Sequence, residues 1–467
     1  MGDDVTIVSP STLSWRVKLA YGIGHVLNDL CASMWFTYLL LYFHFVLKFN
    51  NAYSGIILLI GQIADAVSTP FIGIESDRVD DFWFCKYGRR KTWHLVGTIC
   101  VLGTFPFIFM PCVQCENAHQ GAQMVYYAAF VIIFQFGWAA VQVAHLALIP
   151  DLTPDEHERT ELNAIRYAFT VLSNISVYTI TWVVLGLQQD NPGTQKIGPE
   201  DTTSFQSIVL ITVSVGALFS VLFHMGVKES SPQPYTTLDG GETRKMKVMD
   251  WLRIFPLYQV AALYMLARLF VNVTQVYIPL YLQDSLELKE ESIAVIPLVM
   301  FIIGFLSSFG MKKLNQMAGR KITYALGAAL GIGACIWVQL GSESTLFRTY
   351  EVYAVAALLG VSMTTVLITS LSITTDLIGQ NIESGAFVYG AMSFCDKLAN
   401  GVAVLLIQVV HPCRDVCPGC GGYYRDIISY FSGSTLILSL VVVATIIPTT
   451  FHRPRSGGLP LVVVSSP

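Results

Sequence analysis

The most specific local pattern in this chain lies in one polar loop, which reads GIESDR at Gly73–Arg78 and GRRK at Gly88–Lys91. An apolar run of membrane-spanning length stands on each side of the loop. Anchoring of positive charge on the cytosolic side would explain the three bases of the second string, but it would not explain Asp77. An acid and several bases at the ends of two spans can clamp neighbouring helices and release them. We therefore expect a cytosolic gate formed by Asp77, Arg78, Arg89, Arg90 and Arg166.

The composition predicts an all-α membrane protein with many spans. Of the 467 residues, 53% are apolar and only 13% are charged, whereas an ordinary soluble protein carries roughly 25% charge. Twelve spans of about 20 residues would use about 240 residues and leave room for short loops. We expect helical spans at 16–44, 53–75, 92–111, 124–149, 164–188, 205–226, 256–283, 292–311, 321–341, 349–373, 384–410 and 426–449.

The distribution of Lys and Arg predicts the orientation. Nineteen of these 28 residues lie in the termini or in loops after even-numbered spans, and six lie in loops after odd-numbered spans. Because cytosolic loops carry the excess of positive charge, both termini are expected in the cytosol. The segment 1–14 is acidic and has no basic region before a short apolar core, so the first span is expected to act as an uncleaved insertion signal.

Paired motifs indicate two similar halves, as in transporters built from repeats. GRK at Gly319–Lys321 follows GRRK by 231 positions, and TDL at Thr375–Leu377 follows PDL at Pro150–Leu152 by 225 positions. Coincidence between short strings is the alternative. The expected organisation is a cytosolic N-terminus at 1–15, a six-helix bundle at 16–226, a cytosolic linker at 227–255, a second six-helix bundle at 256–450 and a cytosolic C-terminus at 451–467.

Polar side chains recur at helical spacing inside five apolar spans. A charge at the bilayer centre costs at least about 2.5–3.5 kcal/mol, so such residues are expected to face partners or a water-filled cavity. The stripes run through His25, Asn28 and Asp29 in the first span; Gln62, Asp65 and Thr69 in the second; Gln135, Trp138, Gln142 and His145 in the fourth; Tyr264, Arg268, Asn272 and Gln275 in the seventh; and Tyr389, Ser393, Asp396, Lys397 and Asn400 in the eleventh.

We interpret these stripes as the lining of a central cavity that binds a zwitterion. Asp29 would meet a cationic group and Arg268 or Lys397 a carboxylate, while Asp65 and Asp396 would couple an ion or a proton. Interhelical salt bridging of Lys397 with Asp396 or Asp29 is the alternative, and His145 is expected to be structural. The substrate-binding candidates are His25, Asn28, Asp29, Gln135, Trp138, Gln142, Tyr264, Arg268, Asn272, Gln275, Tyr389, Ser393 and Lys397.

The chain resembles the major facilitator superfamily. Its second-to-third loop is similar to the signature of that superfamily, and the long spacing within the loop resembles the glycoside–pentoside–hexuronide:cation symporter branch. The resemblance implies that Asp29 contacts substrate and that Asp65 and Lys397 belong to the coupling site. Thr69 and Gln142 stand where the branch has two further carboxylates. A sodium site of three carboxylates is therefore not expected, and Asp65 suits proton coupling or no ion coupling.

Longer strings resemble a vertebrate group within the superfamily that imports cysteine into the lumen of lysosomes and melanosomes and takes part in pigmentation. They are NDLCASMWFTY at 28–38, WHLVGT at 93–98, FQFGW at 134–138 and SGAFVYG at 384–390. The resemblance implies a cysteine carrier in the lysosomal and melanosomal membrane. A cation-coupled sugar or lysophospholipid symporter is the alternative within the branch, and a receptor or scaffold without transport is the alternative of another class. We expect a monomer with no enzyme activity, no cofactor, no metal and no nucleic-acid partner.

Five of the ten cysteines lie in two loops on the non-cytosolic side, namely Cys112, Cys115, Cys413, Cys417 and Cys420. Disulfides in a lumenal compartment are the leading interpretation, and metal ligation together with His411 is the alternative. Because five is odd, at least one of these thiols should stay free or pair elsewhere. In the linker, YTTL at Tyr235–Leu238 fits a tyrosine-based signal for endolysosomal sorting adaptors, although motifs of four residues often arise by chance.

Overall fold

The computed structural model describes residues 13–77, 87–115, 117–153, 155–187, 196–229, 248–341, 344–378, 382–412 and 422–446. Within these ranges the regular structure is helical throughout, without a strand. Because lipid offers no hydrogen-bond partners, a chain that crosses it must satisfy its backbone groups inside each helix. The predicted all-α membrane fold is confirmed.

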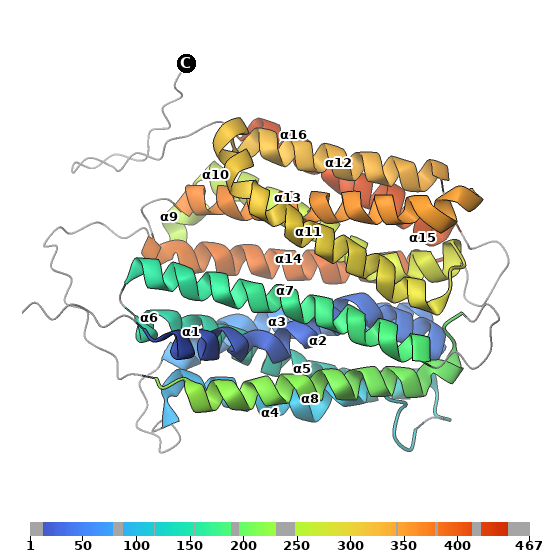
Figure 1. The fold of residues 1–467 in the computed structure, drawn as a ribbon, viewed down its shortest axis with the longest axis horizontal. Helices are drawn as coiled ribbons and strands as arrows, with labels where there is room; N and C mark the ends of the chain where they lie inside the picture. The colour runs from blue at the N-terminus through green and yellow to red at the C-terminus, as the bar shows by residue number, and fades with distance from the viewer. Residues whose placement is uncertain are drawn as a thin grey trace, which may run out of the picture.

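The N-terminal half runs from α1 to α8 (Figure 1). Its first span is interrupted: a 3-10 turn separates two α-helical parts, and a π turn ends the span. In chain order the elements are α1 (Trp15–Gly22), η1 (Ile23–His25), α2 (Val26–Leu41), η2 (Tyr42–Val46), α3 (Asn51–Asp77), α4 (Arg89–Ile108), α5 (Gln120–Ala147), α6 (Ile149–Leu152), α7 (Glu156–Leu187), η4 (Pro199–Asp201) and α8 (Thr202–Gly226).

The C-terminal half begins after a short helix in the linker, α9 (Val248–Leu252), and contains the other six long segments. They are α10 (Phe255–Leu280) with η5 (Tyr281–Ser285), α11 (Glu290–Ala318), α12 (Arg320–Gly341), η6 (Phe347–Glu351) with α13 (Val352–Ile378), α14 (Ile382–Val410), and α15 (Tyr423–Asp426) with η7 (Ile427–Phe431) and α16 (Ser432–Thr445).

Eleven of the described helical segments are long and apolar enough to cross a membrane. The remaining predicted span is α4, whose 20 residues begin with three bases and include a proline. It packs along α5 and α8 within the same bundle, so we treat it as the third span. Two predicted boundaries were short by about two turns, because α7 and α11 continue as helix through polar and charged residues at the end assigned to the cytosol.

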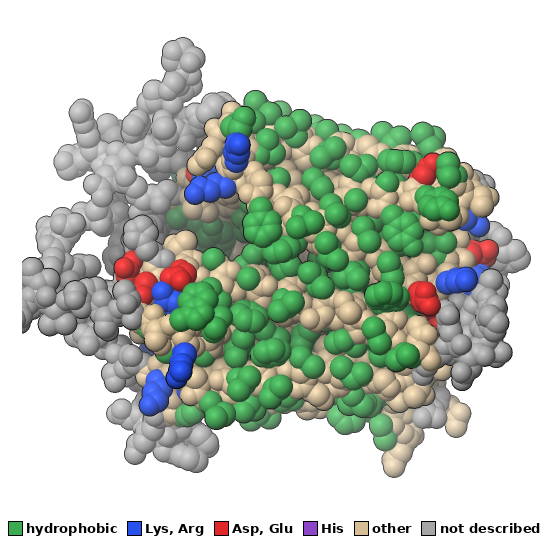
Figure 2. Space-filling model, viewed as in Figure 1, with side chains coloured by type: hydrophobic (Ala, Val, Ile, Leu, Met, Phe, Trp, Pro, Cys, Tyr) green, Lys and Arg blue, Asp and Glu red, His purple; other side chains and the backbone are tan. Residues whose placement is uncertain are grey.

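The two halves lie side by side, with their helices running along the long axis of the molecule (Figure 1). They meet through α3 with α14, α7 with α11 and α2 with α10. Figure 2 shows apolar side chains over the middle of the visible face and charged side chains gathered toward its two ends. This distribution suits a protein whose waist contacts lipid and whose ends contact water.

The ends of the first and seventh spans show the repeat in backbone geometry. Each span closes with a π turn, η2 or η5, and a residue with positive φ follows two positions later: Lys48 at 54° and Glu287 at 55°. The backbone bonds correspond as well, from Leu47 N to Tyr42 O at 3.0 Å and from Leu286 N to Tyr281 O at 3.0 Å. These matching turns extend the repeat that the paired sequence motifs indicate to the ends of the first and seventh spans.

Small residues let α4 and α5 pack closely. A Cβ added to Gly97 would lie 2.6 Å from the carbonyl oxygen of Gly137 and 2.9 Å from a methyl group of Val141. Gly103, two turns further along α4, has nothing within 4 Å of the same added atom. Close approach of two backbones through small residues is a common way to pack helices in membranes.

This contrast predicts different outcomes for one substitution at two positions of α4. Gly97→Leu should destabilise the protein by about 1–3 kcal/mol, because the new side chain must displace α5. The thermal midpoint of the purified protein in detergent should fall accordingly. Gly103→Leu is the matched control and should leave that midpoint near the wild-type value. Equal midpoints for the two variants would contradict the packing.

Candidate functional site

A buried ion pair connects the two halves in the middle of the bundle. Lys397 Nζ on α14 lies 2.7 Å from Asp65 Oδ1 on α3, and both side chains are largely buried. Thr69 completes the group, because its hydroxyl donates to Asp65 Oδ1 at 3.1 Å and receives a bond from Lys397 Nζ at 2.9 Å. A lysine ammonium and a threonine hydroxyl thus surround Asp65 in this state.

A second buried ion pair lies within the C-terminal half. Arg268 Nε on α10 lies 2.9 Å from Asp396 Oδ2 on α14. Asn400 donates from its side-chain amide to the carboxylate and the backbone carbonyl of Asp396. The Arg268 side chain keeps 28% of its surface exposed, while that of Asp396 keeps 3%. Part of the Arg268 side chain therefore remains accessible to solutes.

The N-terminal half holds a third acid, Asp29, on α2. Its Oδ1 lies 2.9 Å from His25 Nδ1, a contact of ion-pair distance without hydrogen-bond alignment. Its Oδ2 accepts a hydrogen bond of 2.8 Å from the hydroxyl of Thr170 on α7. Beside it, Asn28 ties α2 to α5 by donating to the backbone carbonyl of Trp138 at 2.8 Å. Asn28 therefore holds two helices together in this state.

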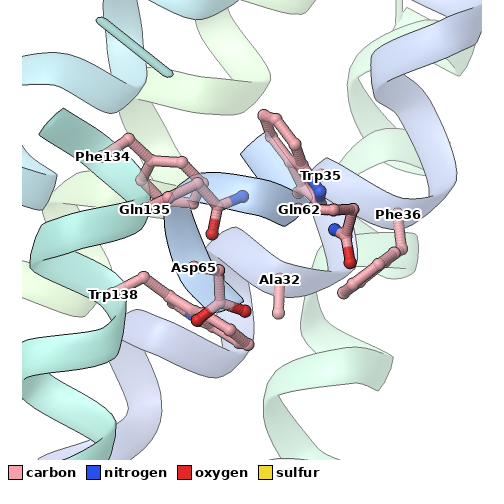
Figure 3. A pocket seen from close by; sticks show the side chains of 8 residues that line it. All are labelled: Ala32, Trp35, Phe36, Gln62, Asp65, Phe134, Gln135 and Trp138. Atoms are coloured by element: carbon pink, nitrogen blue, oxygen red, sulfur yellow. The ribbon is translucent and has the colours of Figure 1, made fainter. Parts of the chain in front are cut away.

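A pocket opens next to Asp65 (Figure 3), and the space of about 200 Å³ within it includes the part that is open to solvent. Four of its eight lining residues are aromatic. The amides of Gln62 and Gln135 border it and make no hydrogen bond within the described ranges. The Lys397 ammonium lies 5.8 Å from the centre of the Trp138 ring. The lining residues are Ala32, Trp35, Phe36, Gln62, Asp65, Phe134, Gln135 and Trp138.

Sequence reasoning missed four of these lining residues, Ala32, Trp35, Phe36 and Phe134. Three of them follow Asn28 and Asp29 at intervals of three and four residues, so they continue the same face of the first span. The helical period therefore predicts that Ala32, Trp35 and Phe36 share the face of Asn28 and Asp29. The prediction from sequence included only the polar residues of that face.

The other predicted residues of the C-terminal half occupy different environments. Gln275 is buried and crosses to the N-terminal half, where it donates to the hydroxyls of Thr37 at 3.2 Å and Tyr178 at 3.5 Å. Tyr389 is partly exposed and shares a 2.8 Å hydrogen bond with Thr375. Asn272 is buried, whereas Tyr264, Ser393 and, in the N-terminal half, Gln142 are half-buried.

The charged motifs near the cytosolic end hold each half together in the same manner. Arg90 Nη1 lies 3.1 Å from Asp151 Oδ2, and Arg320 pairs with Asp376 in the second half. In the first bundle the GRRK motif therefore contacts the PDL motif, and in the second bundle the GRK motif contacts the TDL motif. The carboxylate of Glu229, after α8, accepts bonds of 3.0–3.2 Å from the backbone N–H groups that begin α4, as expected for an anion at a helix N-terminus.

The other gate candidates are placed as follows. Arg89 is half-buried in the first turn of α4. Arg166 lies within the N-terminal bundle, close enough to act electrostatically on His25, Tyr21 and His145. Arg78 and the side chain of Asp77 lie outside the described residues.

A latch of four residues joins the halves at the end opposite the predicted cytosolic side. Lys196 Nζ lies 2.7 Å from Glu287 Oε1, and Gln283 donates to the carbonyl of Ile197 at 3.1 Å. Figure 2 shows a recess between the halves at the other end, on the left of the view. The structure therefore represents a state that is closed at this latch and parted at the end predicted to be cytosolic.

The pKa of Glu287 is lowered from its ordinary value of 4.5, because Lys196 donates a hydrogen bond to its carboxylate and attracts it electrostatically. A carboxyl with a lowered folded-state pKa stabilises the fold above its ordinary pKa and loses this contribution as the pH falls through the lowered value. The latch therefore holds in mildly acidic solution and weakens only at lower pH.

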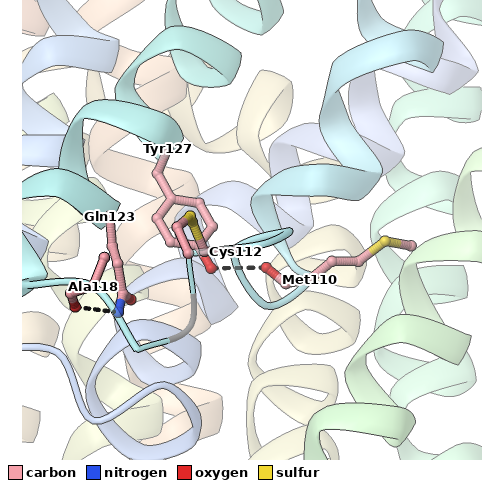
Figure 4. Close-up of a disulfide and its surroundings, with 6 residues drawn as sticks. Met110, Cys112, Ala118, Gln123 and Tyr127 are labelled. Atoms are coloured by element: carbon pink, nitrogen blue, oxygen red, sulfur yellow. Dashed lines mark hydrogen bonds between the residues drawn. A yellow bond between two sulfur atoms is a disulfide. The ribbon is translucent and has the colours of Figure 1, made fainter.

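Cys112 and Cys115 form a disulfide just after α4 (Figure 4). Tyr127 on α5 donates to the carbonyl of Met110 at 2.8 Å and holds the same turn against the bundle. Cys413, Cys417 and Cys420 lie outside the described residues, as does the YTTL string at 235–238. In the described part of the chain, no group of three His, Cys, Asp or Glu side chains has metal-binding geometry.

Comparison with known proteins supplies the family. The family model described as MFS/sugar transport protein matches residues 20–411. The chain is 45% identical over 466 residues to Major facilitator superfamily domain-containing protein 12 of Homo sapiens, covering 95% of this chain and 96% of that protein. It is 46% identical over 442 residues to the protein of the same name from Equus caballus, covering 91% of each. A solved D-xylose–proton symporter shares the fold, with a TM-score of 0.67 at 14% identity, and covers 93% of this chain and 98% of that one.

The central ion pair predicts a compensating double variant. Asp65→Asn should cost about 3–5 kcal/mol of stability, because it leaves the Lys397 ammonium buried without its counterion. Adding Lys397→Met should recover most of that loss in thermal midpoint.

The latch provides the matched control. Lys196 and Glu287 keep 50% and 58% of their side-chain surfaces exposed, so Lys196→Met should cost only about 0–1 kcal/mol. A double variant of Asp65 and Lys397 that is no more stable than Asp65→Asn would contradict the pairing.

Proposed function

The chain belongs to the MFS/sugar transport protein family and is thus a membrane transporter and not an enzyme, and we propose that its cargo is cysteine. It carries cysteine from the cytosol into the lumen of lysosomes and melanosomes by alternating access, with coupling to protons. The support for the cargo is the chemistry of the cavity together with the resemblance of four strings in the sequence to vertebrate cysteine carriers.

The observation that carries the proposal is a cluster of charges of both signs between the halves. Asp65 pairs with Lys397, and Arg268 pairs with Asp396. Arg268 and Asp396 also act electrostatically on Asp65, so the two pairs are neighbours. Buried charges on several helices inside a membrane protein are typical of substrate and ion pathways, and Asp65 itself lines the pocket. A zwitterionic amino acid can exchange partners with such pairs without adding net charge to the cavity.

Each part of cysteine has a suitable partner. The accessible part of Arg268 can bind the carboxylate, and Asp29 can bind the ammonium group. Asp29 precedes Ala32, a lining residue, by three positions on the same helix. The rings of Trp35 and Trp138 offer the soft, apolar contact that sulfur favours. The unbonded amides of Gln62 and Gln135 remain for polar contacts.

A sugar is the second candidate, since aromatic rings and free side-chain amides also suit a hydroxyl-rich ligand. A distant relative, at 22% identity over 361 residues, is named a glucuronide carrier protein homolog from Escherichia coli. The paired charges favour the zwitterion, because a neutral sugar would have to leave both ion pairs intact.

The state of the structure agrees with loading from the cytosol. The latch at Lys196 and Glu287 is closed, while the recess between the halves lies at the end that the charge pattern assigns to the cytosol. Rocking of one half against the other around a central site would then present the site to the lumen. Sorting to endolysosomal membranes is proposed to use the YTTL string at Tyr235–Leu238 as an adaptor signal.

Transport assays with purified protein in liposomes test the cargo. Wild-type protein should take up radiolabelled cysteine but not a glucuronide or xylose. Arg268→Gln and Asp29→Asn should each lower uptake about 10- to 100-fold, because each removes a charge-assisted contact that contributes about 1.5–3 kcal/mol.

Lys196→Gln, in the exposed latch, is the control and should keep at least half of the wild-type uptake. Uptake of the sugars in place of cysteine would support the second candidate. Wild-type rates in both cavity variants would overturn the assignment of Arg268 and Asp29.

A further inference from the structure

Two uncharged amides stand beside the charged groups of the cargo site. Gln62 on α3 and Gln135 on α5 are only 3% and 2% exposed, yet both line the pocket next to Asp65. Neither amide makes a hydrogen bond with any residue in the described part of the chain. A buried amide without a partner costs free energy, so buried polar groups in native proteins are almost always matched. The pocket therefore offers hydrogen-bonding capacity that the protein itself does not use.

The charges and the amides of the pocket lie at two depths. Asp65 follows Gln62 by three residues on α3, and Trp138 follows Gln135 by three residues on α5. At a rise of about 1.5 Å per residue, each amide stands about 4.5 Å further along its helix than the residue that follows it by one turn. Both helices run toward the end predicted to be cytosolic. The amides are therefore displaced from Asp65 and Trp138 toward the predicted lumenal end.

The first span adds aromatic rings to this deeper layer. Because α2 runs toward the predicted lumenal end, Trp35 and Phe36 lie beyond Asp29 and Ala32. The Trp35 indole N–H is buried and has no hydrogen-bond partner among the described residues. The ring centre of Phe134 lies 5.5 Å from that of Trp35. None of the pocket-lining residues at this depth is ionisable.

Figure 3 shows how the polar groups of the pocket face one another. The amides of Gln135 and Gln62 stand on either side of the space, and the Asp65 carboxylate lies toward Trp138. Asp65 is paired with Lys397 at 2.7 Å, so neither of these charges is free to serve a group between the amides. A charged group at that depth would lose its hydration without gaining a counterion, at a high cost. The space between the amides therefore suits an uncharged group.

We propose that Gln62 and Gln135 determine the specificity of the cargo site by binding an uncharged thiol. The proposal rests on the proposed function, in which Asp29 and Arg268 bind the charged ends of the cargo. With the ammonium group held at Asp29, the side chain of the cargo extends toward the lumenal end and terminates between the two amides. The charged layer of the pocket thus recognises an amino acid, and the uncharged layer recognises its side chain.

A thiol matches this layer both in its hydrogen bonds and in its contacts with rings. The S–H group donates weakly to an amide oxygen, and the sulfur accepts weakly from an N–H group of an amide or of Trp35. Sulfur also makes favourable contacts with aromatic rings. A hydroxyl finds the same amides but gains less from the rings, whereas a methyl group finds the rings but leaves the amides unpaired. Among these three groups, only the thiol uses both parts of the layer.

Ligand-induced shifts in the thermal midpoint of the full-length protein in detergent report binding without transport. Cysteine should stabilise the wild type at about tenfold lower concentration than 2-aminobutyrate, whose methyl group replaces the thiol and leaves the amides unpaired. Gln62→Met and Gln135→Met replace each amide with an apolar chain of similar length. Each should bring the two ligands to within about twofold of one another. Gln123→Met, near the start of α5 and outside the pocket, is the matched control and should keep the tenfold difference.

The wild type alone provides a second test, should the methionine variants fold poorly. Cysteine sulfinate carries an anionic group in place of the thiol and should not shift the midpoint at concentrations at which cysteine does. A shift of equal size with cysteine sulfinate, or tighter binding of serine than of cysteine, would overturn the thiol as the bound group.

Uptake of labelled cysteine into liposomes distinguishes this proposal from the proposed function. Cysteine uptake by the wild type, with the tenfold difference in binding kept in both methionine variants, would overturn the role of Gln62 and Gln135 and leave cysteine as the cargo. Absence of uptake, with a binding preference that is lost in the variants, would support the thiol site and reject cysteine transport. A wild type that neither binds nor carries cysteine would reject both.

Discussion

The ion pair between Asp65 and Lys397 is the contact on which the arrangement of the two halves depends. Both groups are withdrawn from water, where an unpaired charge would be costly. Their pairing draws α3 against α14 at the middle of the bundle and brings the Lys397 ammonium toward the Trp138 ring. The pocket beside Asp65 is lined by residues of α2, α3 and α5, so it belongs to the N-terminal half and lies next to this contact.

Contacts elsewhere between the halves differ in how easily they break. The latch at Lys196 and Glu287 is exposed to solvent, and exposed ion pairs contribute little to stability. Breaking the pair of Lys196 and Glu287 therefore requires little free energy, whereas the buried pair needs a substitute partner before it can separate. A zwitterionic cargo or a proton on Asp65 could supply that substitute, which would link cargo binding to the change of state.

The two halves of the protein also repeat the contacts that hold their helices together. Arg90 with Asp151, and Arg320 with Asp376, join corresponding helix ends inside each bundle. The matching π turns near Lys48 and Glu287 end the first and seventh spans in the same way. The two halves are thus held together internally by equivalent contacts, as expected of two repeats that move as units.

The sequence by itself determined the helical spans and the faces that carry polar groups, because hydropathy and a period of 3.6 residues depend only on local order. It did not determine which charged side chains form ion pairs with one another. Lys397 follows Asp396 in the chain, yet it pairs with Asp65 in the other half, while Asp396 pairs with Arg268. Only the tertiary structure decided these pairings, since they depend on the depth and rotation of helices packed from distant parts of the chain.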